Sequence, residues 1–121
     1  MKKIIILSII MSFFTFQSCV QKVHIKEITF KVDMNHVSTV ENVGIKGNFT
    51  NPSWEKIIPL TDENNDGIYE GTFREKTAAT TIQFKFVNQN QYELKDQPNR
   101  TLQFEFKPEI LTYEATFNVA K

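Results

Sequence analysis

Two stretches of this 121-residue chain combine aromatic and hydrogen-bonding side chains that could bind a sugar. The first stretch contains the single tryptophan, Trp54. The second contains Lys85, Tyr92 and Asn99. The apolar C–H faces of a pyranose ring stack on aromatic rings, and its hydroxyl groups need hydrogen-bond donors and acceptors. Exposed side by side, these residue types predict a carbohydrate-binding surface.

The residue types needed for catalysis or metal binding are poorly placed. The two histidines, His24 and His36, have no partner at the spacing typical of a zinc site. No serine is flanked by glycines, as a nucleophile elbow requires. The 14 aspartates and glutamates leave a glycosidase-like carboxylate pair open, but no motif supports one. We therefore predict a non-catalytic protein that needs no metal or other cofactor.

The segment from Asp62 to Gly67, with the sequence DENNDG, is the strongest turn signal in the chain. Asparagine, aspartate and glycine tolerate the left-handed backbone of a hairpin turn. The segment also matches the first half of a calcium-binding loop, but Phe73 stands where that loop needs a bidentate glutamate. We predict a turn here, with weak calcium binding as the alternative.

The N-terminus has the pattern of a secretory signal. Lys2 and Lys3 precede an apolar run from Ile4 to Phe16 that is too short to span a membrane. The only cysteine, Cys19, follows directly after Ser18 and resembles the lipidated cysteine of bacterial lipoproteins. The alternative is an ordinary cleaved signal that leaves a free thiol. We expect a signal peptide over residues 1–18, a lipidated cysteine and spacer over 19–26, and one domain over 27–121.

The rest of the chain alternates apolar and polar residues with a period of two, as β-strands do. Expected strands include one over residues 28–34, one over 68–74 and one over 102–106. Turn signals separate the short strands, which is typical of an immunoglobulin-like fold. We predict an all-β, antiparallel sandwich of seven to eight strands. Its expected core residues are Phe30, Val32, Ile45, Phe84, Phe86, Phe104 and Phe117.

Charge gives little support for nucleic-acid binding. Lysine and arginine number 14, equal to aspartate and glutamate, and no basic block or stripe stands out. A lone cysteine cannot form an internal disulfide, so the stability of the domain must come from its core.

Four motifs occur in the order found in the starch-binding domains of carbohydrate-binding module family 20, which this chain resembles. The glycogen-binding modules of family 48 are similar. The resemblance covers about residues 28–117. The motifs are Gly47-Asn48 followed by Trp54, Leu60-Thr61-Asp62 followed by Gly67-Ile68-Tyr69-Glu70, Phe84-Lys85-Phe86, and Tyr92-Glu93 followed by Pro98-Asn99-Arg100.

The resemblance implies a role for each matching residue. The aromatic rings of Trp54 and Tyr92 would be the platforms on which consecutive glucose units stack. Lys85 and Asn99 would hydrogen-bond the sugar hydroxyls, and Glu93 is a weaker candidate for such a contact. Tyr92 stands where the family has tryptophan, and the interval to Asn99 is longer than in the family. We interpret Arg100 as structural, bracing its loop with a carboxylate.

The resemblance and the N-terminal signal together predict a non-catalytic, lipid-anchored protein of the bacterial cell envelope, in particular of the outer membrane. Its expected ligand is a starch- or glycogen-like α-glucan, and its expected partners are glycan-degrading enzymes or a transporter. The alternative is an envelope lipoprotein that uses the same sandwich for protein–protein contact and has lost glucan binding. Exposure of the two aromatic platforms on one surface would favour the first function.

Overall fold

A computed structural model describes residues 22–120, in which the secondary structure is entirely β. The expected signal peptide and Cys19 lie outside the described residues. Within the described part, no helix is long and apolar enough to cross a membrane. The eight strands are β1 (His24–Asp33), β2 (Gly44–Gly47), β3 (Ile58–Pro59), β4 (Ile68–Thr77), β5 (Thr81–Asn88), β6 (Gln91–Tyr92), β7 (Arg100–Gln103) and β8 (Glu109–Thr116).

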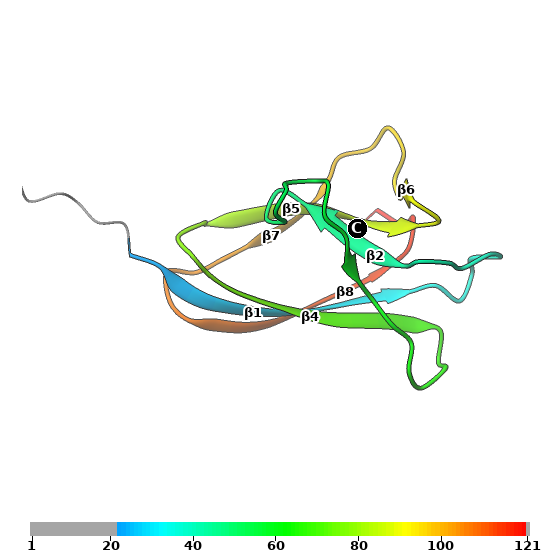
Figure 1. Cartoon of the computed structure of the whole chain (residues 1–121), viewed down its shortest axis with the longest axis horizontal. Helices are drawn as coiled ribbons and strands as arrows, with labels where there is room; N and C mark the ends of the chain where they lie inside the picture. The colour runs from blue at the N-terminus through cyan, green and yellow to red at the C-terminus, as the bar shows by residue number, and fades with distance from the viewer. Residues whose placement is uncertain (1–21, 121) are drawn as a thin grey trace, which may run out of the picture.

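The strands form two packed sheets, which confirms the predicted all-β sandwich (Figure 1). One sheet has the order β4-β1-β8, and the other has the order β3-β2-β5-β6. Strand β7 also pairs with β5, and it shares with β6 the edge of β5 that faces away from β2. One pairing differs from the expected antiparallel arrangement, because β1 and β8 run parallel.

The core lies between the sheets and combines aliphatic side chains with a connected group of phenylalanines. The Phe84 ring is central, with its centroid 5.1 Å from Phe30 and 4.9 Å from Tyr113, both in edge-to-face contact. Such pairs stabilise a core beyond their buried area. Six of the seven predicted core residues are buried, and Phe104 is only partly buried. The Phe104 ring instead covers the ammonium of Lys26 at 5.1 Å, at the margin of the sandwich.

Lys26 lies at two of the strand boundaries that differ from the prediction. Strand β1 begins at His24, inside the expected spacer, because residues 24–27 pair with the end of β4. The Lys26 side chain is buried beneath the β7–β8 connection. Its ammonium donates hydrogen bonds to the carbonyls of Glu105 and Lys107, both at 2.6 Å. These bonds draw the chain away from the ladder, so β7 ends at Gln103 and the expected strand position Phe106 is 73% exposed.

The Asp62–Gly67 segment is a turn between β3 and β4, as predicted. The Asp62 carboxylate accepts hydrogen bonds from the backbone N–H groups of Asp66 and Gly67 at 3.1 and 2.9 Å. Gly67 has a φ of 83°, which glycine adopts without strain. Phe73 packs against the core, and no cluster of three potential metal-ligating side chains occurs among the described residues.

Candidate functional site

Four of the five predicted sugar-contacting residues meet on the outer face of the five-stranded sheet. Trp54, Lys85, Tyr92 and Asn99 line one open hollow of about 270 Å³, which we call the aromatic hollow. They come from the β2–β3 loop, from β5, from β6 and from the end of the β6–β7 loop. Both loops rise from the side of the sheet that faces away from β1, β4 and β8 (Figure 1).

Trp54 is held in place by the backbone of its own loop. Its N–H donates to the carbonyl of Gly47 at 2.9 Å and lies 3.1 Å from the hydroxyl oxygen of Thr50. The buried Thr50 hydroxyl donates in turn to the Gly47 carbonyl at 2.9 Å. Trp54 has a φ of 62°, an unusual conformation for a large residue. This turn leaves the indole half-buried at the rim of the hollow.

The two aromatic side chains of the hollow contact each other. The ring centroids of Trp54 and Tyr92 are 6.1 Å apart, with an angle of 71° between the planes. The Tyr92 hydroxyl donates a hydrogen bond to the Trp54 carbonyl at 2.9 Å. Tyr92 remains 45% exposed, so its ring is available to a ligand. The two platforms are therefore steeply inclined to each other and do not form one flat surface.

Lys85 points outward from β5, as the alternation predicts, and braces the β6–β7 loop. Its ammonium donates to the carbonyls of Leu94 and Gln97 at 3.0 and 2.9 Å. Because an ammonium has three protons, one donor remains for a ligand. Directly opposite on β2 lies Lys46, and like charges at such positions repel each other. The Lys46 ammonium lies 5.7 Å from the centre of the Tyr92 ring.

Asn99 lines the hollow from the end of the β6–β7 loop and is exposed. Its amide nitrogen donates to the side-chain oxygen of Gln83 at 3.3 Å. Gln83 is the next outward-facing residue of β5 before Lys85, and it is also exposed. The amide oxygen of Asn99 and the amide nitrogen of Gln83 thus bring polar groups to the rim.

The structure corrects the fifth residue, Glu93. Its side chain is buried and ion-paired to Arg100, with the Arg100 Nε 2.6 Å from Oε2. Its carboxylate also accepts hydrogen bonds from the backbone N–H groups of Phe86 and Asn118, at 2.8 and 3.0 Å. With Nη2 of Arg100, which donates to Oε1 at 2.8 Å, the buried carboxylate has four donors and cannot reach a ligand at the surface. Glu93 is therefore structural, and Arg100 braces its loop through a carboxylate, as predicted.

The ion pair also stabilises the charged form of Arg100. Burial disfavours the charged guanidinium, but the hydrogen bonds and negative charge of Glu93 outweigh this and raise the pKa of Arg100. The second terminal nitrogen, Nη2, donates to the carbonyls of Thr116 and Val119 at 3.1 and 3.0 Å. The pair thus fastens the β6–β7 loop to the chain that follows β8.

Two residues beside the hollow, Lys46 and Gln83, were missed by the sequence analysis. Both occupy outward-facing positions of strands that carry inward-facing apolar residues. The alternation alone places them on the same face as Lys85. Only the pairing of β2 with β5 shows that Lys46 stands opposite Lys85.

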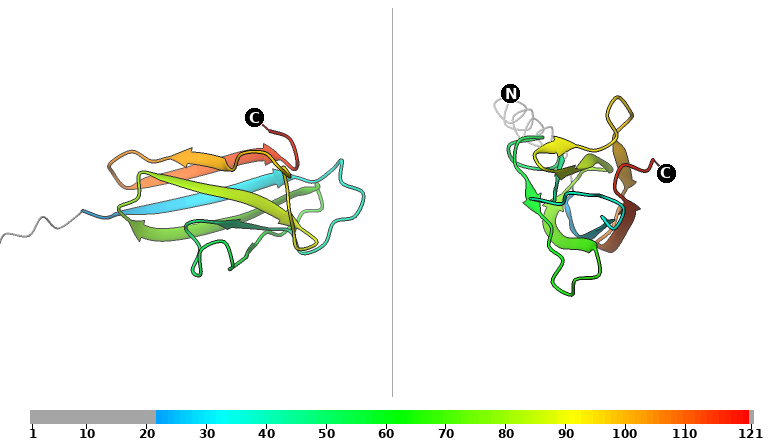
Figure 2. Two further views of the ribbon diagram at one scale, coloured as in Figure 1. Left: turned by 90° about the horizontal axis from the view of Figure 1, so that it is seen from above. Right: turned by 90° about the vertical axis from the view of Figure 1, so that its right-hand side faces the viewer.

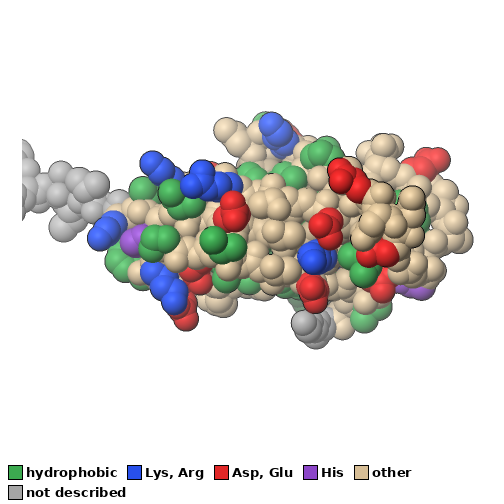
Figure 3. Space-filling view, turned by 90° about the horizontal axis from the view of Figure 1, so that it is seen from below, with side chains coloured by type: hydrophobic (Ala, Val, Ile, Leu, Met, Phe, Trp, Pro, Cys, Tyr) green, Lys and Arg blue, Asp and Glu red, His purple; other side chains and the backbone are tan. Residues whose placement is uncertain are grey.

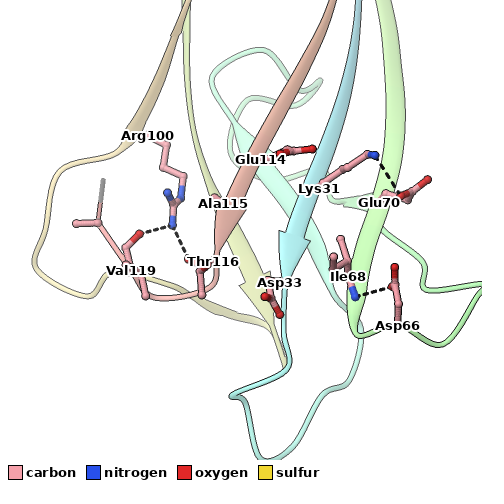
Figure 4. Close-up of a pocket in the computed structure, with 11 residues that line it drawn as sticks. Lys31, Asp33, Asp66, Ile68, Glu70, Arg100, Glu114, Ala115, Thr116 and Val119 are labelled. Carbon is pink, nitrogen blue, oxygen red and sulfur yellow. Dashed lines mark hydrogen bonds and ion pairs between the residues drawn. The ribbon is translucent and has the colours of Figure 1, made fainter.

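A larger hollow of about 520 Å³ lies elsewhere, over the outer face of the three-stranded sheet (Figure 4). Most of its charged groups already have protein partners. Lys31 lies 3.9 Å from Glu70, and Asp66 accepts a hydrogen bond from the N–H of Ile68 at 2.9 Å. Among residues 22–120, no aromatic side chain lines this hollow, so they offer no stacking platform for a sugar there. The aromatic hollow is the better candidate despite its smaller volume.

Comparison with known proteins identifies no family for this chain, because no protein-family model and no curated protein matches it.

Proposed function

We propose that this chain is a non-catalytic, lipid-anchored protein that binds an α-glucan, such as starch or glycogen, in the aromatic hollow. The observation that carries the proposal is the convergence of Trp54, Lys85, Tyr92 and Asn99 on one open surface. Trp54 lies more than 30 residues before the other three in the sequence, and the four residues come from four different segments of the chain. Their side chains supply two stacking faces and several hydrogen-bonding groups, which is the combination that a sugar ring requires.

The shape of the hollow favours a polymer over an enclosed small molecule. Small-molecule sites usually bury most of their ligand in a deep cleft, whereas the aromatic hollow is open and of about 270 Å³. Two stacking contacts and a few hydrogen bonds, less the ordering of a flexible chain, predict a Kd of roughly 10 µM to 1 mM per site. Several anchored copies on one polymer would raise the overall avidity.

The steep angle between the platforms favours a curved glucan. Consecutive glucose units of an α-1,4-linked chain turn relative to each other, whereas a β-1,4-linked chain is nearly flat. Rings inclined at 71° can each face one unit of a turning chain, but they cannot both lie flat against an extended ribbon. This geometry supports α-glucans as the ligand class.

The alternative function, protein–protein contact, receives less support. Trp54 would be expected in the core if the sandwich had no surface ligand, yet it is only half-buried and Tyr92 is 45% exposed. The expected partners, glycan-degrading enzymes or a transporter, remain part of the proposal because they would use the captured glucan.

Native gel electrophoresis with polysaccharide in the gel tests the binding. We expect retardation by starch and glycogen and none by a β-1,4-glucan. Trp54→Ala should abolish most of the retardation, and Tyr92→Ala should weaken it strongly. Phe106→Ala is the matched control because it removes an exposed aromatic residue outside the hollow. Equal retardation of the protein and its folded Trp54→Ala variant would contradict the proposal.

The lipid anchor is tested separately. Replacing Cys19 by serine removes the sulfur that would carry the lipid, so the variant should leave the membrane fraction. If Cys19→Ser still partitions with membranes, the anchor is wrong, whatever the gels show for glucan binding.

A further inference from the structure

Apolar side chains are exposed together at the end of the sandwich where β1 begins. Phe106 and Ile110 are 73% and 83% exposed, and Val23 is 51% exposed. Phe106 contacts His24 edge to face at 4.7 Å, next to Val23, and Ile110 pairs in register with Glu27 of β1. Figure 2 shows the β7–β8 loop beside the start of β1. Several exposed apolar side chains at one end of a domain can mark an interaction surface.

A buried charge holds the loop that presents Phe106. The Lys26 ammonium donates to the carbonyls on either side of Phe106 and to the carboxylate of Glu109, all at 2.6 Å. Glu109 also accepts a hydrogen bond from the N–H of Glu105 at 2.8 Å. Phe106 is therefore held on a braced loop and directed away from the core.

The charges of the three-stranded sheet and of the β3–β4 and β7–β8 connections are unevenly distributed along the length of the sheet. Together with Lys22, which precedes β1, five basic residues and four acidic residues lie at the end where β1 begins, namely Lys22, Lys26, Arg74, Lys76 and Lys107 against Glu27, Glu75, Glu105 and Glu109. Toward the opposite end, one lysine stands against six acidic residues, namely Lys31 against Asp33, Asp62, Glu63, Asp66, Glu70 and Glu114. In Figure 3, blue side chains gather toward the left end with red ones among them, and red side chains prevail toward the right.

The sequence places the expected lipid close to the apolar end. Cys19 precedes Val23 by four residues. Four residues of extended chain span at most about 14 Å. A diacylated Cys19 would therefore keep this end of the domain within a short distance of the lipid headgroups.

We propose that this end of the sandwich rests on a membrane of anionic phospholipid, with Phe106, Ile110 and Val23 in the headgroup layer. The inference rests on the proposed lipid anchor. Apolar side chains enter the membrane interface, and an anionic surface repels the acidic opposite end of the domain. Both effects turn the apolar end toward the membrane. The aromatic hollow, on the outer face of the other sheet, would then open sideways to a glucan lying along the membrane.

A single tryptophan reports the contact. Because Trp54 is the only tryptophan, Trp54→Phe combined with Phe106→Trp places the sole indole at the proposed contact. The full protein, isolated with its lipid, is incorporated into phosphatidylethanolamine and phosphatidylglycerol vesicles that contain acyl-brominated lipid. We expect a shift of the emission to shorter wavelength and quenching by bromine. Trp54→Phe with Ser38→Trp, an exposed position in the β1–β2 loop, is the control and should show neither effect.

The outcomes separate this inference from the anchor and from glucan binding. If the acylated Phe106→Trp variant emits like the Ser38→Trp control, the membrane contact is overturned and the anchor is left intact. If mass spectrometry of the isolated protein detects no acyl chains, both the anchor and the membrane contact are overturned. A concentration-dependent blue shift of the same indole in the Cys19→Ser protein without vesicles would assign the apolar surface to a second copy of the chain, and would also overturn the proposal. None of these readouts requires glucan.

Discussion

Glu93 and Arg100 form a buried ion pair at the two ends of the β6–β7 loop, and each directly adjoins a residue of the aromatic hollow. Tyr92 precedes Glu93, and Asn99 precedes Arg100. The pair is joined by two hydrogen bonds, at 2.6 and 2.8 Å. Arg100 also lies with its guanidinium 5.4 Å from the centre of the Phe86 ring in the core. The ion pair thus connects the positions of Tyr92 and Asn99 to the packed interior.

Replacing Glu93 by glutamine should destabilise the domain. The change leaves the Arg100 charge buried without a counter-charge, which costs about 3–5 kcal/mol in the free energy of unfolding. Urea denaturation measures the loss, and Glu63→Gln, at an exposed turn position, should leave the midpoint unchanged. Replacing both Glu93 and Arg100 by methionine should restore only part of the stability, because the N–H groups of Phe86 and Asn118 would still lack an acceptor. An unchanged midpoint for Glu93→Gln would show that the pair contributes nothing.

Replacing Tyr92 by phenylalanine should weaken glucan binding while keeping a stacking ring. The hydroxyl holds the Trp54 carbonyl at 2.9 Å, so its removal releases one connection between the platforms. We expect a loss of about 0.5–1.5 kcal/mol in binding to a linear α-1,4-linked oligosaccharide, measured by titration calorimetry. Tyr69→Phe, on β4, is the control and should bind normally. Identical affinities for Tyr92→Phe and the unchanged protein would mean that this hydrogen bond does not order the hollow.

Replacing Lys85 by alanine should loosen the β6–β7 loop as well as remove a ligand contact. The ammonium holds two loop carbonyls, and we expect a loss of about 1–2 kcal/mol in stability. Hydrogen exchange should accelerate in residues 94–99 more than in β5. Lys95→Ala removes an exposed charge from the same loop and should change stability by less than about 0.5 kcal/mol. Unchanged exchange in the loop would limit Lys85 to contact with the ligand.

Stability should fall at acidic pH, and Glu109 should account for part of the change. The hydrogen bond from Lys26 lowers the pKa of Glu109, although burial opposes the effect. The unfolded chain therefore takes up a proton at this position at a higher pH than the folded chain does. The stabilisation that ionised Glu109 contributes is complete above the ordinary glutamate pKa of about 4.3. It is lost as the pH falls through the lower pKa that Glu109 has in the folded protein.

The pH dependence is measured as the urea midpoint between neutral and strongly acidic solution. Glu109→Gln should be less stable at neutral pH and should lose less stability on acidification than the unchanged protein. Parallel curves for the two proteins would exclude Glu109 as a source of the dependence. Protonation of Asp66 should likewise lower stability at acidic pH, because its pKa in the folded protein is lowered, mainly by the hydrogen bond from the N–H of Ile68.

The sequence alone determined which face of each long strand is apolar. A strand directs successive side chains to opposite sides, so a period of two in hydropathy places Phe84 and Phe86 inward and Lys85 outward whatever the partner strands are. The Asp62–Gly67 turn was predictable for the same reason, since its backbone preferences and its carboxylate caps are local. The all-β class follows from these local signals.

The tertiary structure decided the features that depend on residues far apart in the sequence. Glu93 is polar and follows an exposed tyrosine, and nothing local shows that Arg100 would neutralise it in the interior. The strand expected through Phe106 ends early because Lys26, from the other sheet, binds the carbonyls beside it. Trp54 meets Tyr92 only because β2 and β6 pair with opposite edges of β5. Long-range pairing and the solvation of buried charge are properties of the folded arrangement, so hydropathy along the chain does not reveal them.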